Sequence, residues 1–152
     1  MTGLWSSGFL GRGAPLGADV NLVVEIALGV VLLFGMSLAR RGWYRGHGAC
    51  QASVYLAVIV LTAVWMVPSL HDTYGPSLFA GDVNRVNVAV AAHIVAGTTA
   101  LLIGAYVVLV AGTRLVPHRF RFDDYKIWMR TLLGLWWLAI VLGVLTYWLA
   151  TS

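Results

Sequence analysis

Charge is the scarcest property of this chain. Asp, Glu, Lys and Arg make up 11% of its 152 residues, whereas 60% are hydrophobic. This composition excludes a disordered chain, which needs high charge and low hydrophobicity. It also disfavours a water-soluble fold, because so short a chain cannot bury that much apolar surface. Cysteine is nearly absent too: Cys50 stands alone, which excludes a disulfide framework and a cysteine-based metal cluster.

Motifs of the common enzyme classes are also missing. The sequence holds no nucleotide-binding glycine loop and no Ser/His/Asp or Cys/His hydrolytic set. It therefore favours a role other than catalysis. The net charge of +4 comes from two short segments rather than from a basic face, and we expect no nucleic-acid partner.

Long apolar runs are abundant instead. A membrane-spanning helix needs about 20 mostly apolar residues, and its backbone must satisfy its own hydrogen bonds. Short connections make successive helices antiparallel neighbours. The sequence therefore predicts an all-α, integral membrane, four-helix antiparallel bundle within residues 19–152, preceded by a loose external segment over residues 1–18. The four runs are Val20–Ala39, Cys50–Leu70, Val86–Gly112 and Ile127–Ala150.

Basic residues gather in the first and third connections. Cytoplasmic loops carry an excess of Lys and Arg, so this pattern predicts a multi-pass protein of the cell membrane, in contact with lipid, with both termini outside. The basic residues are Arg40, Arg41, Arg45, Arg114, Arg119, Arg121 and Lys126.

Two histidines are expected near the outer face. His71 ends the second apolar run, and His93 lies about two turns into the third. Neutral imidazole binds haem iron, copper or zinc, and two histidines on adjacent antiparallel helices can hold a haem between them. Ionisable groups inside a membrane suggest a functional site, and His93 needs a polar partner or a metal there. The alternative for His71 is an interfacial side chain with its ring in water.

Glu25 is expected at the depth of His93. It can accept the second ring proton of a ligating histidine or take a proton from a quinol. The alternative is a protonated acid bonded to a neighbouring helix. Gly97 and Gly104 share a face with His93. They leave room for a flat macrocycle or, as we favour for the glycines alone, allow close helix packing.

A second, inner pair of candidate ligands is formed by His47 and His118. His47 precedes the second apolar run, and His118 lies in the third connection, where an ordinary solvated histidine is the simpler reading. Arg130 lies just inside the last run. It either extends to the inner interface or pairs with a haem propionate.

Several short motifs, in order across all four runs, resemble the family called domain of unknown function 420. The resemblance covers Asp19 to Trp148. The matching pieces are Asn21-Leu22, His47, His71, Ala92-His93-Ile94, Leu109 to Arg114, Arg130-Thr131, Trp136, Gly143 and Tyr147. Members of the CtaM (YozB) type are linked to maturation of haem-copper cytochrome oxidases. The resemblance implies a role near terminal oxidases, in haem or copper delivery or in oxidase assembly.

One position departs from the family pattern. The family's fourth histidine lies five residues before the arginine of the last helix, where this chain has Tyr125. Either His118 substitutes for it, or a tyrosinate serves as ligand, or the inner site is absent. The outer pair is unaffected.

Three hypotheses follow. The leading one is an oxidase maturation factor that binds haem or copper through His71 and His93, with Glu25 behind them, and contacts oxidase subunits. The second is a b-type cytochrome-like electron carrier or a quinol-linked redox subunit with one haem per membrane face. His47 and His71 are 24 residues apart, about 36 Å along a helix, which suits that spacing. The third is a structural subunit without cofactor.

Overall fold

The computed structural model describes residues 6–112, 117 and 124–152. Within them, four helical runs are long and apolar enough to cross a membrane. The predicted all-α four-helix bundle is confirmed, and its four apolar helices are consistent with a multi-pass membrane protein. The four runs are Leu16–Arg40, Tyr44–Phe79, Arg85–Ala111 and Lys126–Ala150.

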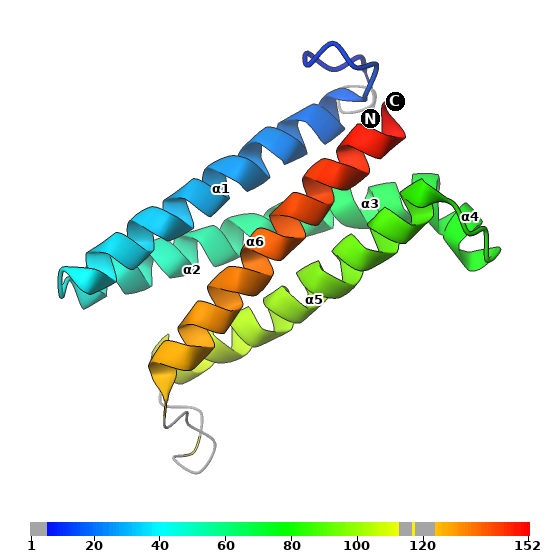
Figure 1. Ribbon diagram of the computed structural model, residues 1–152. Coiled ribbons are helices and arrows are strands. Elements are labelled where there is room, and N and C mark those ends of the chain that lie inside the picture. The colour runs from blue at the N-terminus through cyan, green and yellow to red at the C-terminus, as the bar shows by residue number, and fades with distance from the viewer. Residues whose placement is uncertain (1–5, 113–116, 118–123) are drawn as a thin grey trace.

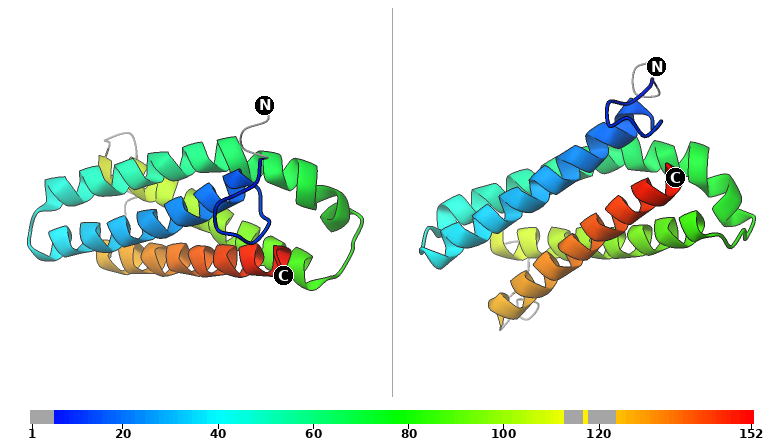
Figure 2. Two further views of the ribbon diagram at one scale, coloured as in Figure 1. Left: turned by 90° about the horizontal axis from the view of Figure 1, so that it is seen from above. Right: turned by 45° about the horizontal axis from the view of Figure 1, so that its top comes forward.

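The helices form two antiparallel hairpins that cross each other. Helix α1 (Leu16–Arg40) lies along α2 (Tyr44–Leu61), and α5 (Arg85–Gly112) lies along α6 (Tyr125–Ala150), as Figures 1 and 2 show. Helix α1 also packs against α6. The start of α1 and the end of α6 lie together at what we call the terminal end, and the α1–α2 connection lies at the opposite, turn end.

Large apolar side chains face outward on every helix. Phe34 of α1 is 61% exposed, Leu56 of α2 63%, Leu102 of α5 68% and Val141 of α6 58%. Leaving one such side chain in water forfeits about 1.5–3 kcal/mol relative to burying it. A bilayer removes this cost, so the outward faces are suited to lipid. The inward faces form a core of Leu32, Val54, Val58, Ala100, Val107, Leu132, Trp136 and Ile140.

A tight turn joins α1 to α2. Gly42 has a φ of +80°, a backbone conformation that glycine adopts without steric cost. The Trp43 amide donates to the Leu38 carbonyl at 2.9 Å, and the Gly42 amide donates to the Ala39 carbonyl at 3.0 Å. This is the Schellman arrangement that ends many helices. It allows α2 to begin at Tyr44, earlier than expected, so His47 lies inside the helix.

The second helical run is interrupted by two π-helical turns. It continues from α2 through η1 (Thr62–Met66), α3 (Val67–Ser69) and η2 (Leu70–Tyr74) to α4 (Gly75–Phe79). Pro68 lies between the two turns. Its ring lacks an N–H and clashes with the carbonyl four residues earlier, and the wider π turn is one way to absorb such a defect. The expected end at Leu70 is therefore not a helix end.

Asn87 secures the connection between α4 and α5. It is only 4% exposed. Its backbone N–H donates to Oδ1 of Asn84 at 2.8 Å, and its side-chain Nδ2 donates to the Asp82 carbonyl at 2.9 Å. The Ser77 hydroxyl donates to its Oδ1 at 3.1 Å. These bonds satisfy donors at the start of α5 and fix where α5 begins.

The N-terminal segment differs from the loose chain that we expected. Residues 6–15 form a loop closed by backbone bonds between Gly8 and Ala14 (2.8 Å) and between Leu16 and Ser6 (2.7 Å). Asp19, 1% exposed, accepts a hydrogen bond from the Leu10 amide at 2.6 Å. A buried carboxylate requires such donors, so Asp19 orders the loop. Composition alone did not reveal this long-range contact.

Candidate functional site

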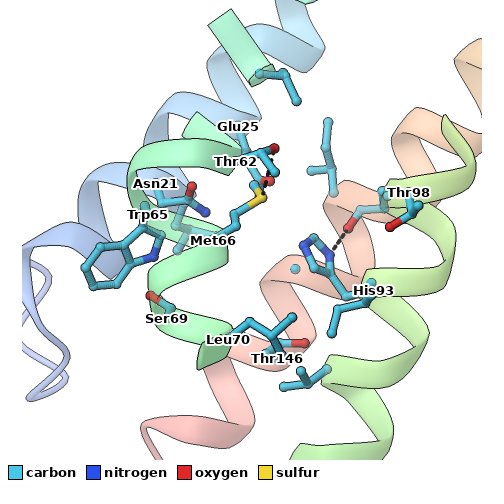
Figure 3. Close-up of a pocket in the computed structure, with 18 of the residues that line it drawn as sticks. Asn21, Glu25, Thr62, Trp65, Met66, Ser69, Leu70, His93, Thr98 and Thr146 are labelled. Atoms are coloured by element: carbon cyan, nitrogen blue, oxygen red, sulfur yellow. Dashed lines mark hydrogen bonds between the residues drawn. The ribbon is translucent and has the colours of Figure 1, made fainter. Parts of the chain in front are cut away.

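A cavity of about 260 Å³ lies among the membrane-spanning helices toward the terminal end. Its walls come from α1, the η1–α3–η2 segment, α5 and α6, and Figure 3 shows several of the side chains that line it. Most lining groups are apolar, with a few polar atoms among them. Pockets for drug-sized ligands have volumes of roughly 300–1,000 Å³. This cavity therefore suits a small ligand or one end of a larger one.

His93 projects from α5 into this cavity. Its Nδ1 lies 2.9 Å from the Ala139 carbonyl oxygen on α6. A carbonyl only accepts hydrogen bonds, so Nδ1 carries the proton and donates it. The lone pair is thereby left on Nε2, which lies on the cavity side of the ring (Figure 3). Metal-binding histidines are commonly fixed in this way, with the other ring nitrogen bonded to a carbonyl.

Glu25 of α1 approaches His93 across Gly143 of α6. A Cβ placed on Gly143 would lie 3.1 Å from Oε2 of Glu25 and 3.1 Å from Cε1 of His93. Those two atoms are therefore no farther apart than twice that distance. A larger residue at position 143 would fill the space in which they meet. The prediction that Glu25 and His93 lie at one depth agrees with this geometry.

The expected role of Glu25 toward the ring proton is not what the structure shows. The Nδ1 proton of His93 goes to the Ala139 carbonyl, because that carbonyl lies directly beside the ring on α6. Among the described residues we find no hydrogen bond to the Glu25 carboxyl group. Glu25 therefore remains available to a ligand in the cavity.

His71 does not join His93, contrary to the expected pair. Its side chain is 86% exposed, and its Nδ1 lies 2.6 Å from Oδ1 of its neighbour Asp72. Leu70 and Tyr74 of the same π turn line the cavity instead. The exposed side chain of His71 turns away from the cavity, although the preceding residues Ser69 and Leu70 line it. His71 and His93 therefore do not form a site that could hold a haem between them.

The predicted inner site lies at the turn end and is only partly described. Nδ1 of His47 donates to the Gly35 carbonyl of α1 at 2.8 Å, so His47 ties α2 to α1. Arg130 is exposed on α6. His118 and the side chain of Tyr125 lie outside the described residues. A ligand at His47 therefore stays a prediction.

No cluster of three or more His, Cys, Asp or Glu side chains suited to a metal ion occurs among the described residues. The two glycines that share a face with His93 have different environments. A Cβ on Gly104 would lie 3.0 Å from the Tyr55 ring, so this glycine allows close packing. A Cβ on Gly97 would meet nothing within 4 Å, and Gly97 lines the cavity.

Two lining residues were not singled out from the sequence as site residues. Oδ1 of Asn21 and Oγ of Ser69 are buried and have no hydrogen-bond partner, and both residues line the cavity. Asn21 lies four residues before Glu25, so a shared helix face could have indicated it. No sequence signal distinguishes Ser69, because its direction depends on the π turns around Pro68.

The N-terminal loop fastens the helices at the terminal end, next to the cavity. The Tyr147 hydroxyl, on a residue that lines the cavity, donates to Oδ1 of Asp19 at 2.7 Å. The Arg12 guanidinium lies 3.7 Å from the centroid of the Trp148 ring, and its Nε donates to Oγ1 of Thr151 at 2.9 Å. These contacts connect the loop to both α1 and α6.

The chain matches no protein-family model, no curated protein and no solved structure. The resemblance to domain of unknown function 420 therefore stays a prediction.

Proposed function

We propose that this protein is a membrane-embedded binding protein whose ligand occupies the cavity beside Glu25 and His93. One observation carries the proposal. The Ala139 carbonyl fixes the imidazole of His93 so that its Nε2 lone pair faces a cavity among membrane-spanning helices. An ionisable side chain among membrane-spanning helices is a functional-site hypothesis by default, and here one of its ring nitrogens is left for a ligand.

The family resemblance supports a biological setting for this site. By that resemblance, the protein serves the maturation of a haem-copper oxidase in the cell membrane and contacts the oxidase subunits. The turn end carries three exposed arginines: Arg40, Arg41 and Arg45. The positive-inside rule supports a cytoplasmic turn end, and we propose that both termini and the cavity lie toward the outside.

Haem is not the ligand that these residues fit best. One imidazole nitrogen faces the cavity, while His71 points away from it. The cavity volume of about 260 Å³ is below the roughly 300–1,000 Å³ of pockets that hold drug-sized ligands, and a porphyrin is larger than most of these. We therefore assign no haem-dependent step to this site.

Copper is a second candidate, supported by Met66. This residue lines the cavity on the wall opposite His93 (Figure 3), and its Sδ lies 3.6 Å from Oγ1 of Thr62. Thioether and imidazole groups suit Cu(I). Bound there, copper would be held by His93 and Met66 as cargo for an oxidase.

Co-purification tests the proposal. The protein is isolated in mild detergent, and its bound small molecules are identified by absorption spectroscopy, metal analysis and mass spectrometry. Gly97→Leu fills the cavity, because its Cβ position is unobstructed. Gly134→Leu is the matched control: Gly134 is exposed on α6, a Cβ there meets nothing within 4 Å, and it does not line the cavity.

We expect a bound molecule in the wild type and in Gly134→Leu, and its loss in Gly97→Leu. Copper in the same pattern would select the second candidate. Equal occupancy in all three proteins would overturn the assignment of the cavity as the site.

A further inference from the structure

The cavity has unsatisfied polar atoms on one wall. Oγ of Ser69 and Oδ1 of Asn21 are buried without a partner, and Ser69 is only 7% exposed. A buried polar atom left unsatisfied costs about 1–3 kcal/mol, and such atoms in a native protein call for an explanation such as a bound ligand. Because both residues line the cavity, a ligand there can satisfy both.

The opposite wall also presents hydrogen-bond acceptors. Nε2 of His93 accepts because Nδ1 carries the ring proton. The carboxyl group of Glu25, which lies on α1 with Asn21, reaches toward it across Gly143. Figure 3 shows Asn21 and Ser69 on one side of the cavity and His93 on the other. Nε2 of His93 and Oδ1 of Asn21 only accept, so a ligand with a donor at each end satisfies both, and the Ser69 hydroxyl can donate or accept.

The rest of the cavity lining is mostly apolar and partly aromatic. Its residues include Met66, Leu70, Ile140 and Trp136. Aromatic side chains pack well against a flat ring. A dry cavity of about 150 Å³ accepts benzene, so about 260 Å³ accommodates a substituted six-membered ring.

We propose that the cavity binds the ring of a hydroquinone, a deepening that rests on the proposed function. One hydroxyl donates to Nε2 of His93, and the hydroxyl across the ring donates to Oδ1 of Asn21 and is contacted by Ser69. The apolar ring edges face the aromatic and aliphatic lining, and any tail stays in the bilayer. The oxidised quinone binds less well, because its carbonyl oxygens have no proton to donate.

Binding of trimethylhydroquinone in lipid nanodiscs tests this, under anaerobic conditions and with tryptophan fluorescence as the signal. Trimethylquinone, tetramethylbenzene and monooctanoylglycerol serve as comparison probes: the oxidised ring, a ring without hydroxyls, and two hydroxyls without a ring. Gly97→Leu and Gly134→Leu separate cavity binding from partition into the bilayer. We expect the hydroquinone to bind at least tenfold more tightly than each comparison probe.

Substitution of the unsatisfied polar residues tests the far wall. Ser69→Ala and Asn21→Leu each remove a contact to the hydroquinone, so we expect binding about tenfold weaker, the equivalent of one hydrogen bond. Binding of tetramethylbenzene should not change. Ser53→Ala, on an exposed position of α2, is the control and should bind all four probes like the wild type.

The outcomes separate this inference from the proposed function. If tetramethylbenzene or monooctanoylglycerol binds as tightly as the hydroquinone, and Gly97→Leu abolishes that binding, the hydroquinone assignment fails and the cavity remains a binding site. Equal affinity for the reduced and oxidised rings would also overturn the assignment. If no probe and no co-purified molecule distinguishes the wild type from Gly97→Leu, both ideas fail.

Discussion

Replacing Gly143 with alanine gives the sharpest test of the site's geometry. The new Cβ would lie 3.1 Å from Oε2 of Glu25, and 3.1 Å and 3.3 Å from Cε1 and Nδ1 of His93. These distances are short for carbon contacts, whose optimum is about 3.5–4.0 Å. The His93 ring cannot retreat freely, because it is bonded to the Ala139 carbonyl. The variant must therefore strain either that bond or the position of Glu25.

Two opposing effects set the magnitude. Glycine to alanine in a helix interior is favourable by about 1 kcal/mol, whereas overpacking a tight site costs about 1–3 kcal/mol. Gly134→Ala, also in α6, receives the favourable effect alone, because a Cβ there meets nothing within 4 Å. In the difference between the unfolding free energies of the two variants, the contribution of helix propensity cancels. Gly143→Ala should be about 1–3 kcal/mol less stable than Gly134→Ala.

Unfolding in mixed micelles, followed by circular dichroism, measures both variants under one set of conditions. Glu25→Ala in the Gly143→Ala background should recover part of the loss, because it removes one of the two crowded partners, and the double-mutant cycle isolates that coupling. The reasoning is refuted if Gly143→Ala is as stable as Gly134→Ala.

Three further predictions concern the terminal end, the π turns and the turn end. Tyr147→Phe removes a donor from the buried Asp19 carboxylate, worth about 1.5–3 kcal/mol; trypsin should cleave after Arg12 faster, and an unchanged cleavage rate by mass spectrometry would contradict it. Pro68→Ala restores a backbone donor, so thermal unfolding should show a more stable helix. Ligand occupancy should fall, because the π turns around Pro68 shape one wall of the cavity; unchanged occupancy would show that the cavity does not depend on those turns. His47→Leu removes one hydrogen bond to α1 and should lower stability by about 0.5–1.5 kcal/mol without altering ligand occupancy. Loss of the ligand would contradict this, because it would show that His47 at the turn end affects the cavity at the terminal end.

Much of the fold could be predicted from the sequence because a bilayer leaves few alternatives. Apolar runs of sufficient length must form helices there, and short connections make them antiparallel. The boundaries were less predictable. The second apolar run was expected to end at Leu70, but the helix continues to Phe79 through two π turns. The 36-residue run Tyr44–Phe79 is about 54 Å long, well beyond the thickness of a bilayer core.

The candidate site was predictable only in part. His93 and Glu25 stood out because ionisable side chains inside apolar runs are costly, and the structure brings both to one cavity. The direction of His71 was not predictable, since each π turn changes the phase of the residues that follow it. Ser69 was missed for the same reason.

By itself, the sequence determined that four apolar helices cross a membrane and that few polar residues lie within them, because apolar length and the cost of burying charge are properties of the chain. Only the tertiary structure decided which of those residues meet. Outward and inward faces of a membrane helix are both apolar, so periodicity distinguishes them weakly. Packing of α1, α5 and α6 around Gly143 brings Glu25 to His93, and the π turns direct Ser69 inward and His71 outward.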